Sequence, residues 1–127
     1  MPITPVKTLV QLAKSEIETL SLGDVQAGID RDDVMLVDIR DVRELDREGR
    51  IPGAFHAPRG MLEFWIDPES PYFKPELATE KKLVLFCASA WRSALSVKAL
   101  QDMGLTNIAE LEGGFANWRA NDGEIES

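Results

Sequence analysis

The segment from Leu83 to Ser93 reads Leu-Val-Leu-Phe-Cys-Ala-Ser-Ala-Trp-Arg-Ser. Its first four residues are an unbroken apolar run, which is typical of a strand buried on both faces of a parallel sheet. Residues 91–103 have helical spacing, and Gly104 is well placed to end that helix. The segment therefore predicts a strand, a short loop and a helix, with the single cysteine, Cys87, at the end of the strand.

The same alternation of strands and helices runs through the rest of the chain. Short apolar runs predict further strands at residues 17–20, 34–38, 53–57 and 108–111. Spacing and capping residues predict helices at 6–17, 21–28, 41–47, 60–66 and after Gly113. On the helix after Cys87, one side carries Ala94, Leu95, Ala99 and Met103, and the other carries mostly Ser93, Ser96, Gln101 and Asp102. This order of elements indicates an α/β domain with a mainly parallel sheet.

Length and charge exclude several classes of protein. The chain has 127 residues, enough for one compact domain, and its 14 basic and 22 acidic residues give a net charge of −8. Such a chain is unsuited to nucleic acid and to anionic membrane surfaces, so we expect neither as a partner. The longest uncharged stretch has nine residues, whereas a membrane span needs about 20. The first residues lack a secretory signal, and we expect a cytoplasmic location.

Cysteine and histidine occur once each, as Cys87 and His56. One cysteine excludes an internal disulfide and any metal site built from several cysteines. We therefore expect no metal and no cofactor. A nucleophile triad of cysteine, histidine and aspartate would have to use His56, because no other histidine is present.

The position of Cys87 suggests a reactive thiol. Ligands in α/β sheets gather at the carboxyl ends of strands, and the small residues after Cys87 allow backbone amides to curl around its sulfur. Together with a helix N-terminus, such surroundings lower the pKa of a thiol below its usual value of about 8.5. A buried structural cysteine is the alternative interpretation. Arg92 and Ser93 favour the interpretation of a reactive thiol, because a cysteine followed by four residues, arginine and serine can form a closed loop that binds an anion.

Four segments together resemble the rhodanese family of sulfurtransferases. They are Val37-Asp38-Ile39-Arg40 with Glu44, Gly49-Arg50-Ile51-Pro52-Gly53-Ala54, the Cys87 loop, and Leu111-Glu112-Gly113-Gly114 followed by Trp118. In the second segment, Arg50 stands where the family usually has histidine. The resemblance implies one rhodanese domain at residues 17–127, with a five-stranded parallel sheet flanked by helices on both faces. Residues 1–16 would be an N-terminal helical extension.

The resemblance implies that Cys87 is the catalytic residue. The active-site loop would be Ala88, Ser89, Ala90, Trp91, Arg92 and Ser93. Six residues from Cys87 to Arg92 match family members that handle sulfur, whereas related phosphatases and arsenate reductases have one residue more. The expected function is transfer of a sulfane sulfur through a Cys87 persulfide. The main alternative is a binding or regulatory module that does no catalysis.

The expected partners follow from this chemistry. The donor would be thiosulfate or a persulfide, including a protein persulfide, and the acceptor a thiol or a cyanide-like nucleophile. Rhodaneses that use thiosulfate well tend to have basic residues in the loop, but this loop has Arg92 alone. Thiosulfate is therefore expected to be a poor donor relative to a persulfide.

Several other residues have both a structural and a functional interpretation. Asp38 could orient the loop or pair with Arg40, and Arg40 and Glu44 could pair at a helix start. His56 is expected to be a satisfied, partly buried histidine rather than a base. The last helix is expected to bury Phe115 and Trp118.

Residues 61–73 contain an unusual density of aromatic side chains among prolines. Three interpretations are open: a local core, a wall beside the active loop, or a patch for weak homodimer formation.

Overall fold

The computed structural model describes residues 2–127, and these residues form a five-stranded sheet. The strands lie in the order β1-β5-β4-β2-β3, and all four neighbouring pairs are parallel. Their bounds are β1 (Thr19–Leu20), β2 (Val34–Asp38), β3 (Phe55–His56), β4 (Lys82–Phe86) and β5 (Ile108–Leu111). The predicted five-stranded parallel sheet is confirmed, and β4, which precedes Cys87, lies at its centre.

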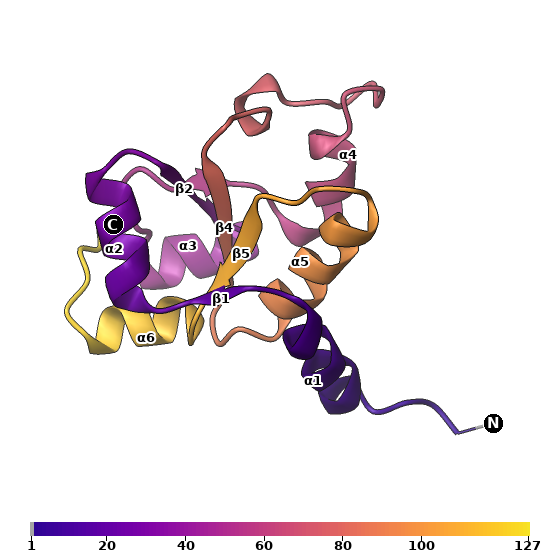
Figure 1. Ribbon diagram of the computed structural model, residues 1–127. Coiled ribbons are helices and arrows are strands. Elements are labelled where there is room, and N and C mark those ends of the chain that lie inside the picture. The colour runs from indigo at the N-terminus through magenta and orange to yellow at the C-terminus, as the bar shows by residue number, and fades with distance from the viewer. Residues whose placement is uncertain (1) are drawn as a thin grey trace.

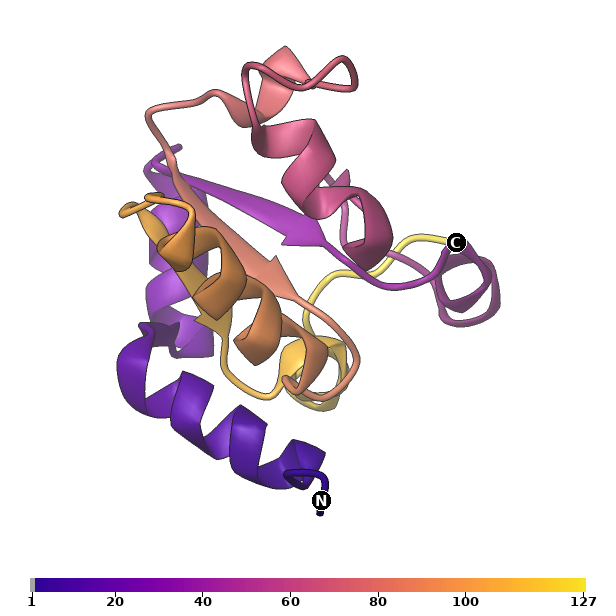
Figure 2. The same ribbon diagram turned by 90° about the vertical axis from the view of Figure 1, so that its right-hand side faces the viewer.

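Helices cover both faces of the sheet, as predicted. They are α1 (Val6–Glu16), α2 (Leu22–Asp30), α3 (Val42–Glu48), α4 (Leu62–Ile66), α5 (Arg92–Asp102) and α6 (Gly114–Ala120), with 3-10 turns at Arg59–Met61 and Pro75–Leu77. Figure 1 shows α2 and α6 on one side of the sheet and α4 and α5 on the other. Figure 2 shows α1 lying against α5, outside the sheet. Within residues 2–127, no helix is both long and apolar enough to cross a membrane.

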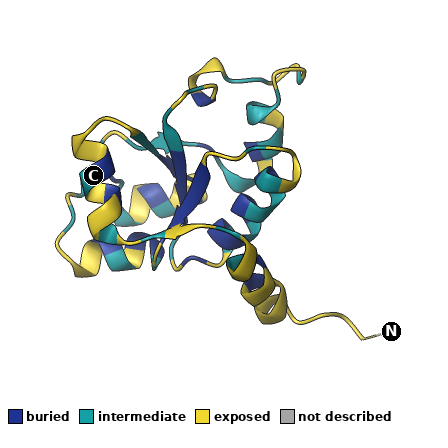
Figure 3. Ribbon diagram, viewed as in Figure 1, coloured by how far each residue is buried: buried dark blue, intermediate teal, exposed yellow. Residues whose placement is uncertain are grey.

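Strands β2 and β4 are buried on both faces because their side chains alternate between two cores. Leu83 and Leu85 pack with Val97 of α5, whereas Val84 and Phe86 join the core that includes α2 and α6. Figure 3 shows most of β4 and β5 in the colour of buried residues. The double burial explains why the sequence here is a continuous apolar run rather than an alternating one.

The predicted sides of α5 were wrong. Ser93 and Ser96 are fully buried, whereas Met103 is 48% exposed. The reason is that α5 lies between the sheet and α1, and Ala94 packs against α1 on the second side. The buried hydroxyls are satisfied by hydrogen bonds, Ser96 donating to the carbonyl of Arg92 at 2.6 Å.

Helix α2 extends beyond its predicted end at Gly28 and stops at Asp30. Gly28 is needed for close packing and not for ending the helix, because a Cβ there would lie 2.4 Å from a methyl group of Val34. The predicted N-cap is confirmed, since the Ser21 hydroxyl accepts a hydrogen bond from the amide of Asp24 at 3.2 Å.

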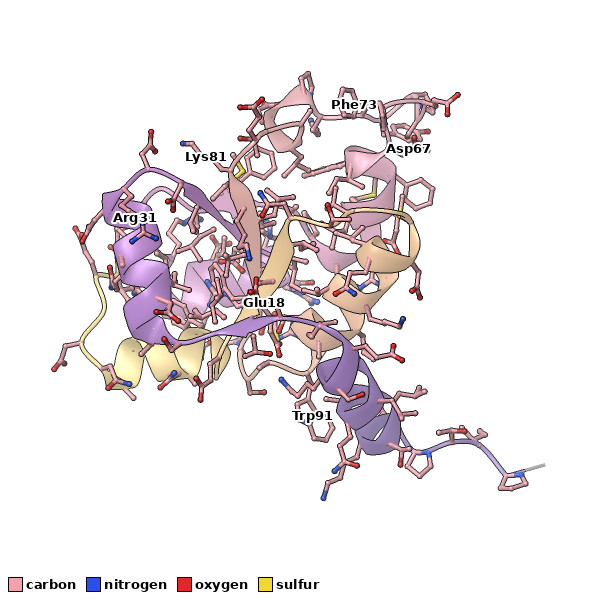
Figure 4. The ribbon with its side chains drawn as sticks, viewed as in Figure 1. Glu18, Arg31, Asp67, Phe73, Lys81 and Trp91 are labelled. Atoms are coloured by element: carbon pink, nitrogen blue, oxygen red, sulfur yellow. The ribbon has the colours of Figure 1, made fainter. Side chains whose placement is uncertain are left out.

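The aromatic segment 61–73 is divided between core and surface: Leu62 is buried, whereas Phe64 is 53% and Tyr72 59% exposed. Trp65 packs edge-on against Phe55, with ring centroids 6.4 Å apart, and Ile66 also joins the α5 side of the core. Figure 4 places Phe73 at one end of the molecule and Trp91, in the Cys87 loop, at the other. The Phe73 end of the segment is therefore far from the loop, whereas Leu62 near its other end belongs to the same core cluster as Cys87.

Candidate active site

Cys87 directly follows β4, and its side chain is 1% exposed. Residues 88–91 turn the chain toward α5, which begins at Arg92. The turn is tight enough to place Ala90 in the left-handed region, with φ 68°. Within residues 2–127, the backbone amides of residues 88–91 donate no hydrogen bond. These free donors lie in the loop that joins Cys87 to the N-terminus of α5, an arrangement suited to binding an anion.

The N-terminus of α6 holds the loop from the other side. The amide of Phe115 donates to the carbonyl of Cys87 at 2.8 Å, and the amide of Ala116 donates to the carbonyl of Ala88 at 3.0 Å. Gly114 makes this approach possible, because a Cβ there would lie 2.5 Å from the Cys87 carbonyl oxygen. Gly114, the first residue of α6, is therefore part of the support of the Cys87 loop.

Arg92 is held by Glu44 of α3. Its two terminal nitrogens donate to the two carboxylate oxygens at 2.8 and 2.9 Å. These bonds raise the pKa of Arg92, to which Cys87 adds a smaller effect, and they lower the pKa of Glu44. The predicted pairing of Glu44 with Arg40 was wrong, because α3 directs Glu44 toward α5 while a second bond from the amide of Asp41 caps the helix.

Ser93 connects the sulfur to a buried carboxylate. Its hydroxyl oxygen lies 3.7 Å from the Cys87 sulfur, and the hydroxyl donates to Glu110 of β5 at 2.7 Å. Glu110 has no exposed surface, and its other oxygen accepts hydrogen bonds from Lys14 at 2.6 Å and from Thr19 at 2.9 Å. Glu110 was not predicted as a site residue from the sequence, although an acid inside the predicted strand 108–111 was the available signal.

Asp38 and Arg40 pair with each other beneath the loop. The guanidinium of Arg40 is fully buried, donates to Asp38 at 2.8 to 3.2 Å, and also donates to the carbonyl of Gly49 at 2.9 Å. It lies 4.1 Å from the centroid of the Phe115 ring. Of the two interpretations of Asp38, pairing with Arg40 is the one found. Through Phe115, the pair supports the helix end that binds the Cys87 carbonyl.

The chain matches the Rhodanese-like domain family over residues 21–121. It belongs to this family. The match covers β2 to β5, the Cys87 loop and α6, and it leaves out β1 and α1, the elements that supply Thr19 and Lys14.

Three relatives illustrate what this rhodanese-like domain is similar to. A Rhodopseudomonas palustris structure, described as a protein of unknown function and a possible tyrosine phosphatase, is 51% identical, covers 99% of both chains and has a TM-score of 0.91. A sulfurtransferase of Allochromatium vinosum is 31% identical over 82% of this chain and 87% of its own. The homodimeric polysulfide-sulfur transferase of Wolinella succinogenes is 30% identical over 94% of this chain and 85% of its own, with a TM-score of 0.70.

A hollow of about 330 Å³ lies beside the Cys87 loop of the rhodanese-like domain. Its lining includes Ala88, Phe115 and Arg119 of α6, together with Glu48 of α3. Arg119 was not predicted as a site residue from the sequence, because its place beside the loop depends on how α6 packs against the end of β4. A larger hollow of about 480 Å³ includes Val34 and Lys82, at the amino ends of β2 and β4, away from the sulfur.

His56 is a satisfied histidine, as predicted. Its Nε2 lies 2.7 Å from the carbonyl oxygen of Arg40, and the ring is partly buried. Within residues 2–127, no group of three histidine, cysteine or acidic side chains is arranged to hold a metal ion. The polar side-chain groups that contact Cys87 are the Ser93 hydroxyl, at 3.7 Å from the sulfur, and the Arg92 guanidinium.

Proposed function

We propose that the protein is a sulfurtransferase that carries a sulfane sulfur on Cys87. The observation that carries this proposal is the set of free amides at residues 88–91, between Cys87 and the N-terminus of α5. Donors fixed in this way stabilise an anion without reorganising, which is the main source of catalysis in many group-transfer sites. Arg92, fixed by Glu44, adds a positive charge on the same side.

The reaction has two half-reactions, in which sulfur is transferred without a net oxidation. First, Cys87 loses its thiol proton to solvent, and the thiolate attacks the outer sulfur of the donor. A new sulfur–sulfur bond forms, the donor bond breaks, and the donor leaves with the electron pair, as a thiolate or as sulfite. Second, an acceptor nucleophile attacks the outer sulfur of the Cys87 persulfide, and Cys87 leaves as a thiolate. The loop amides stabilise the negative charge of the outer sulfur between these steps.

The donor is a persulfide or polysulfide rather than thiosulfate. Within residues 2–127, the loop between Cys87 and Arg92 supplies no second cation, and Arg92 already shares its charge with Glu44. The relationship to a polysulfide-sulfur transferase and to a sulfurtransferase supports this substrate class. The hollow that includes Ala88 and Arg119 offers room for a small donor or acceptor beside the loop.

Phosphate ester hydrolysis is the second candidate. The relative from Rhodopseudomonas palustris, with 51% identity, favours it through its description as a possible tyrosine phosphatase. The loop of six residues argues against it, because related phosphatases have one residue more between cysteine and arginine. A smaller ring of amides suits a single sulfur atom better than a tetrahedral oxyanion.

A cyanolysis assay with several sulfur donors tests the proposal directly. The wild-type protein is expected to form thiocyanate from cyanide, faster with a persulfide or polysulfide than with thiosulfate. Cys87→Ser is expected to abolish the reaction while leaving the fold intact. Absence of transfer from every donor would support the binding or regulatory alternative. Efficient hydrolysis of an aryl phosphate by the wild-type protein would instead support the phosphatase.

A further inference from the structure

A buried chain of hydrogen bonds leads from α1 to the sulfur. Lys14 of α1 and Thr19 of β1 both contact one oxygen of Glu110, at 2.6 and 2.9 Å. The other oxygen accepts the Ser93 hydroxyl at 2.7 Å, and the Ser93 oxygen lies 3.7 Å from the Cys87 sulfur. Three donors, one of them a charged ammonium, therefore meet on one fully buried carboxylate.

The direction of these hydrogen bonds determines whether Ser93 is a donor or an acceptor toward the Cys87 sulfur. A hydroxyl has one hydrogen, and here that hydrogen is donated to Glu110 in a short, charge-assisted bond. The Ser93 oxygen therefore faces Cys87 with a lone pair. A lone pair accepts a hydrogen bond from a neutral thiol, but it repels a thiolate at the same position.

The inner sulfur of a persulfide differs from a thiolate in this respect. When Cys87 carries a second sulfur, the negative charge lies on the outer atom and the inner atom is neutral. A lone pair from Ser93 then faces a neutral sulfur, as it does in the resting thiol. The same lone pair therefore disfavours one state of the cycle, the free thiolate, and tolerates the other two.

We infer that Glu110, held by Lys14 and Thr19, is a positioning residue that keeps Ser93 as an acceptor toward Cys87. This acceptor contact favours neutral sulfur at Cys87, either the thiol or the inner sulfur of a persulfide, over the free thiolate, and it acts against Arg92 and the loop amides. This inference rests on the proposed function for its persulfide part. It also gives α1, which lies outside the family match, a role in the active site.

Other charged groups near Cys87 act in known directions. Arg92 favours the thiolate, and its partner Glu44 reduces that effect. The free amides of residues 88–91 also favour negative charge in the loop. Arg40 is neutralised by Asp38 and lies against the Phe115 ring. Glu110 acts against Arg92 and the loop amides, so its removal is expected to lower the pH midpoint of Cys87 alkylation.

The test is the pH dependence of Cys87 alkylation by iodoacetamide in the full chain. Glu110→Gln frees the Ser93 hydroxyl, and we expect the midpoint of the profile to move down by about one pH unit, close to the effect of one charge-assisted hydrogen bond. An unchanged midpoint would leave Glu110 with a structural role only and overturn the inference. A higher midpoint would also overturn it, since Glu110 would then act as a proton acceptor for the thiol.

Ser93→Ala provides a second variant should Glu110→Gln fail to fold. Loss of the lone pair is expected to lower the midpoint, whereas a serine that donates to the thiolate would give a higher midpoint on removal. Glu110→Gln should add little in the Ser93→Ala background, because its effect passes through Ser93. A full additional shift there would overturn the inference. Ser96→Ala is the matched control: Ser96 is also buried on α5, but it bonds to the Arg92 carbonyl, and its removal should leave the midpoint unchanged.

Single-turnover release of sulfur tests the persulfide part. The protein is loaded with polysulfide, freed of excess donor and mixed with cyanide. Glu110→Gln should release the sulfur several-fold faster, because the departing Cys87 thiolate is less opposed, and equal or slower release would overturn this part. Alkylation needs no sulfur transfer, so a wild-type protein that cannot be loaded would refute the proposed function while the alkylation shift still tests Glu110.

Discussion

The guanidinium of Arg92 donates to both carboxylate oxygens of Glu44, at 2.8 and 2.9 Å, across 48 positions of sequence. This pair joins the first residue of α5 to α3 and sets the direction of the only arginine in the Cys87 loop. Both side chains are partly exposed, Arg92 at 42% and Glu44 at 17%. The pair therefore contributes more to the geometry of the site than to the stability of the fold.

Arg92→Ala is expected to reduce sulfur transfer about ten- to a hundredfold, the size of a lost charge-assisted contact in the transition state. Its melting temperature should change little, because the ion pair is partly exposed. Steady-state cyanolysis and thermal unfolding measure the two effects. Arg43→Ala is the matched control, since Arg43 is an exposed arginine that pairs with Asp41. Full activity in Arg92→Ala would contradict this prediction and would show that Arg92 is only the first residue of a helix.

The ion pair of Glu44 with Arg92 is expected to make the stability of the fold depend on pH. The hydrogen bonds from Arg92 lower the pKa of Glu44 in the folded protein below its ordinary value of 4.5. A carboxyl group with a lowered folded pKa stabilises the fold above its unfolded pKa, and this contribution is lost as pH falls through the folded pKa. Glu44→Gln should therefore lower the free energy of unfolding at pH 7 by up to about 1 kcal/mol, and by less at pH 3. Urea denaturation at the two pH values measures this; an equal loss at both would contradict it.

Gly114→Ala is expected to damage both the fold and the site. The added Cβ would lie 2.5 Å from the Cys87 carbonyl oxygen, so α6 and the loop would have to separate. Gly53→Ala is the control. The φ angle of Gly53 is also positive, 82° compared with 62° for Gly114, but no heavy atom lies within 4 Å of a Cβ added at Gly53. Both variants carry the backbone cost of about 1–2 kcal/mol. Only Gly114→Ala should lose further stability in denaturant and most of its cyanolysis activity; equal behaviour of the two would refute the close-packing argument.

Ala88→Lys is expected to improve the use of thiosulfate. Ala88 is partly exposed and lines the hollow beside the loop, so a lysine there can reach a dianionic donor. The KM for thiosulfate should fall about tenfold, while a neutral persulfide donor should change much less. Ala90 is unsuited to the same change, because it is 4% exposed and has φ 68°. A wild-type protein that already saturates at micromolar thiosulfate would show that another cation, such as Arg119, serves the site.

Local patterns in the sequence were sufficient for most of the fold. The apolar run ending at Phe86 predicted β4, and the capping pattern at Ser21 predicted the start of α2. The place of Cys87 between a strand and a helix followed from the same signals. Such predictions succeed because the periodicity of burial and the satisfaction of helix ends depend on residues close together in the chain.

Contacts between distant segments could not be predicted in this way. Lys14 and Glu110 are separated by 96 positions, and the expected partner of Glu44 was a residue on its own helix start rather than Arg92. The burial of Ser93 was likewise missed, because it depends on contacts with Cys87 and with Glu110 of β5.

The sequence by itself therefore determined the order of strands and helices, the rhodanese resemblance and the candidate nucleophile Cys87. The tertiary structure alone brought Glu44, Glu110 and the N-terminus of α6 to that cysteine. The physical reason is that helical and strand periodicity specify which face of an element is buried. The partner on that face depends on how the packed elements cross, and this is a property of the whole chain.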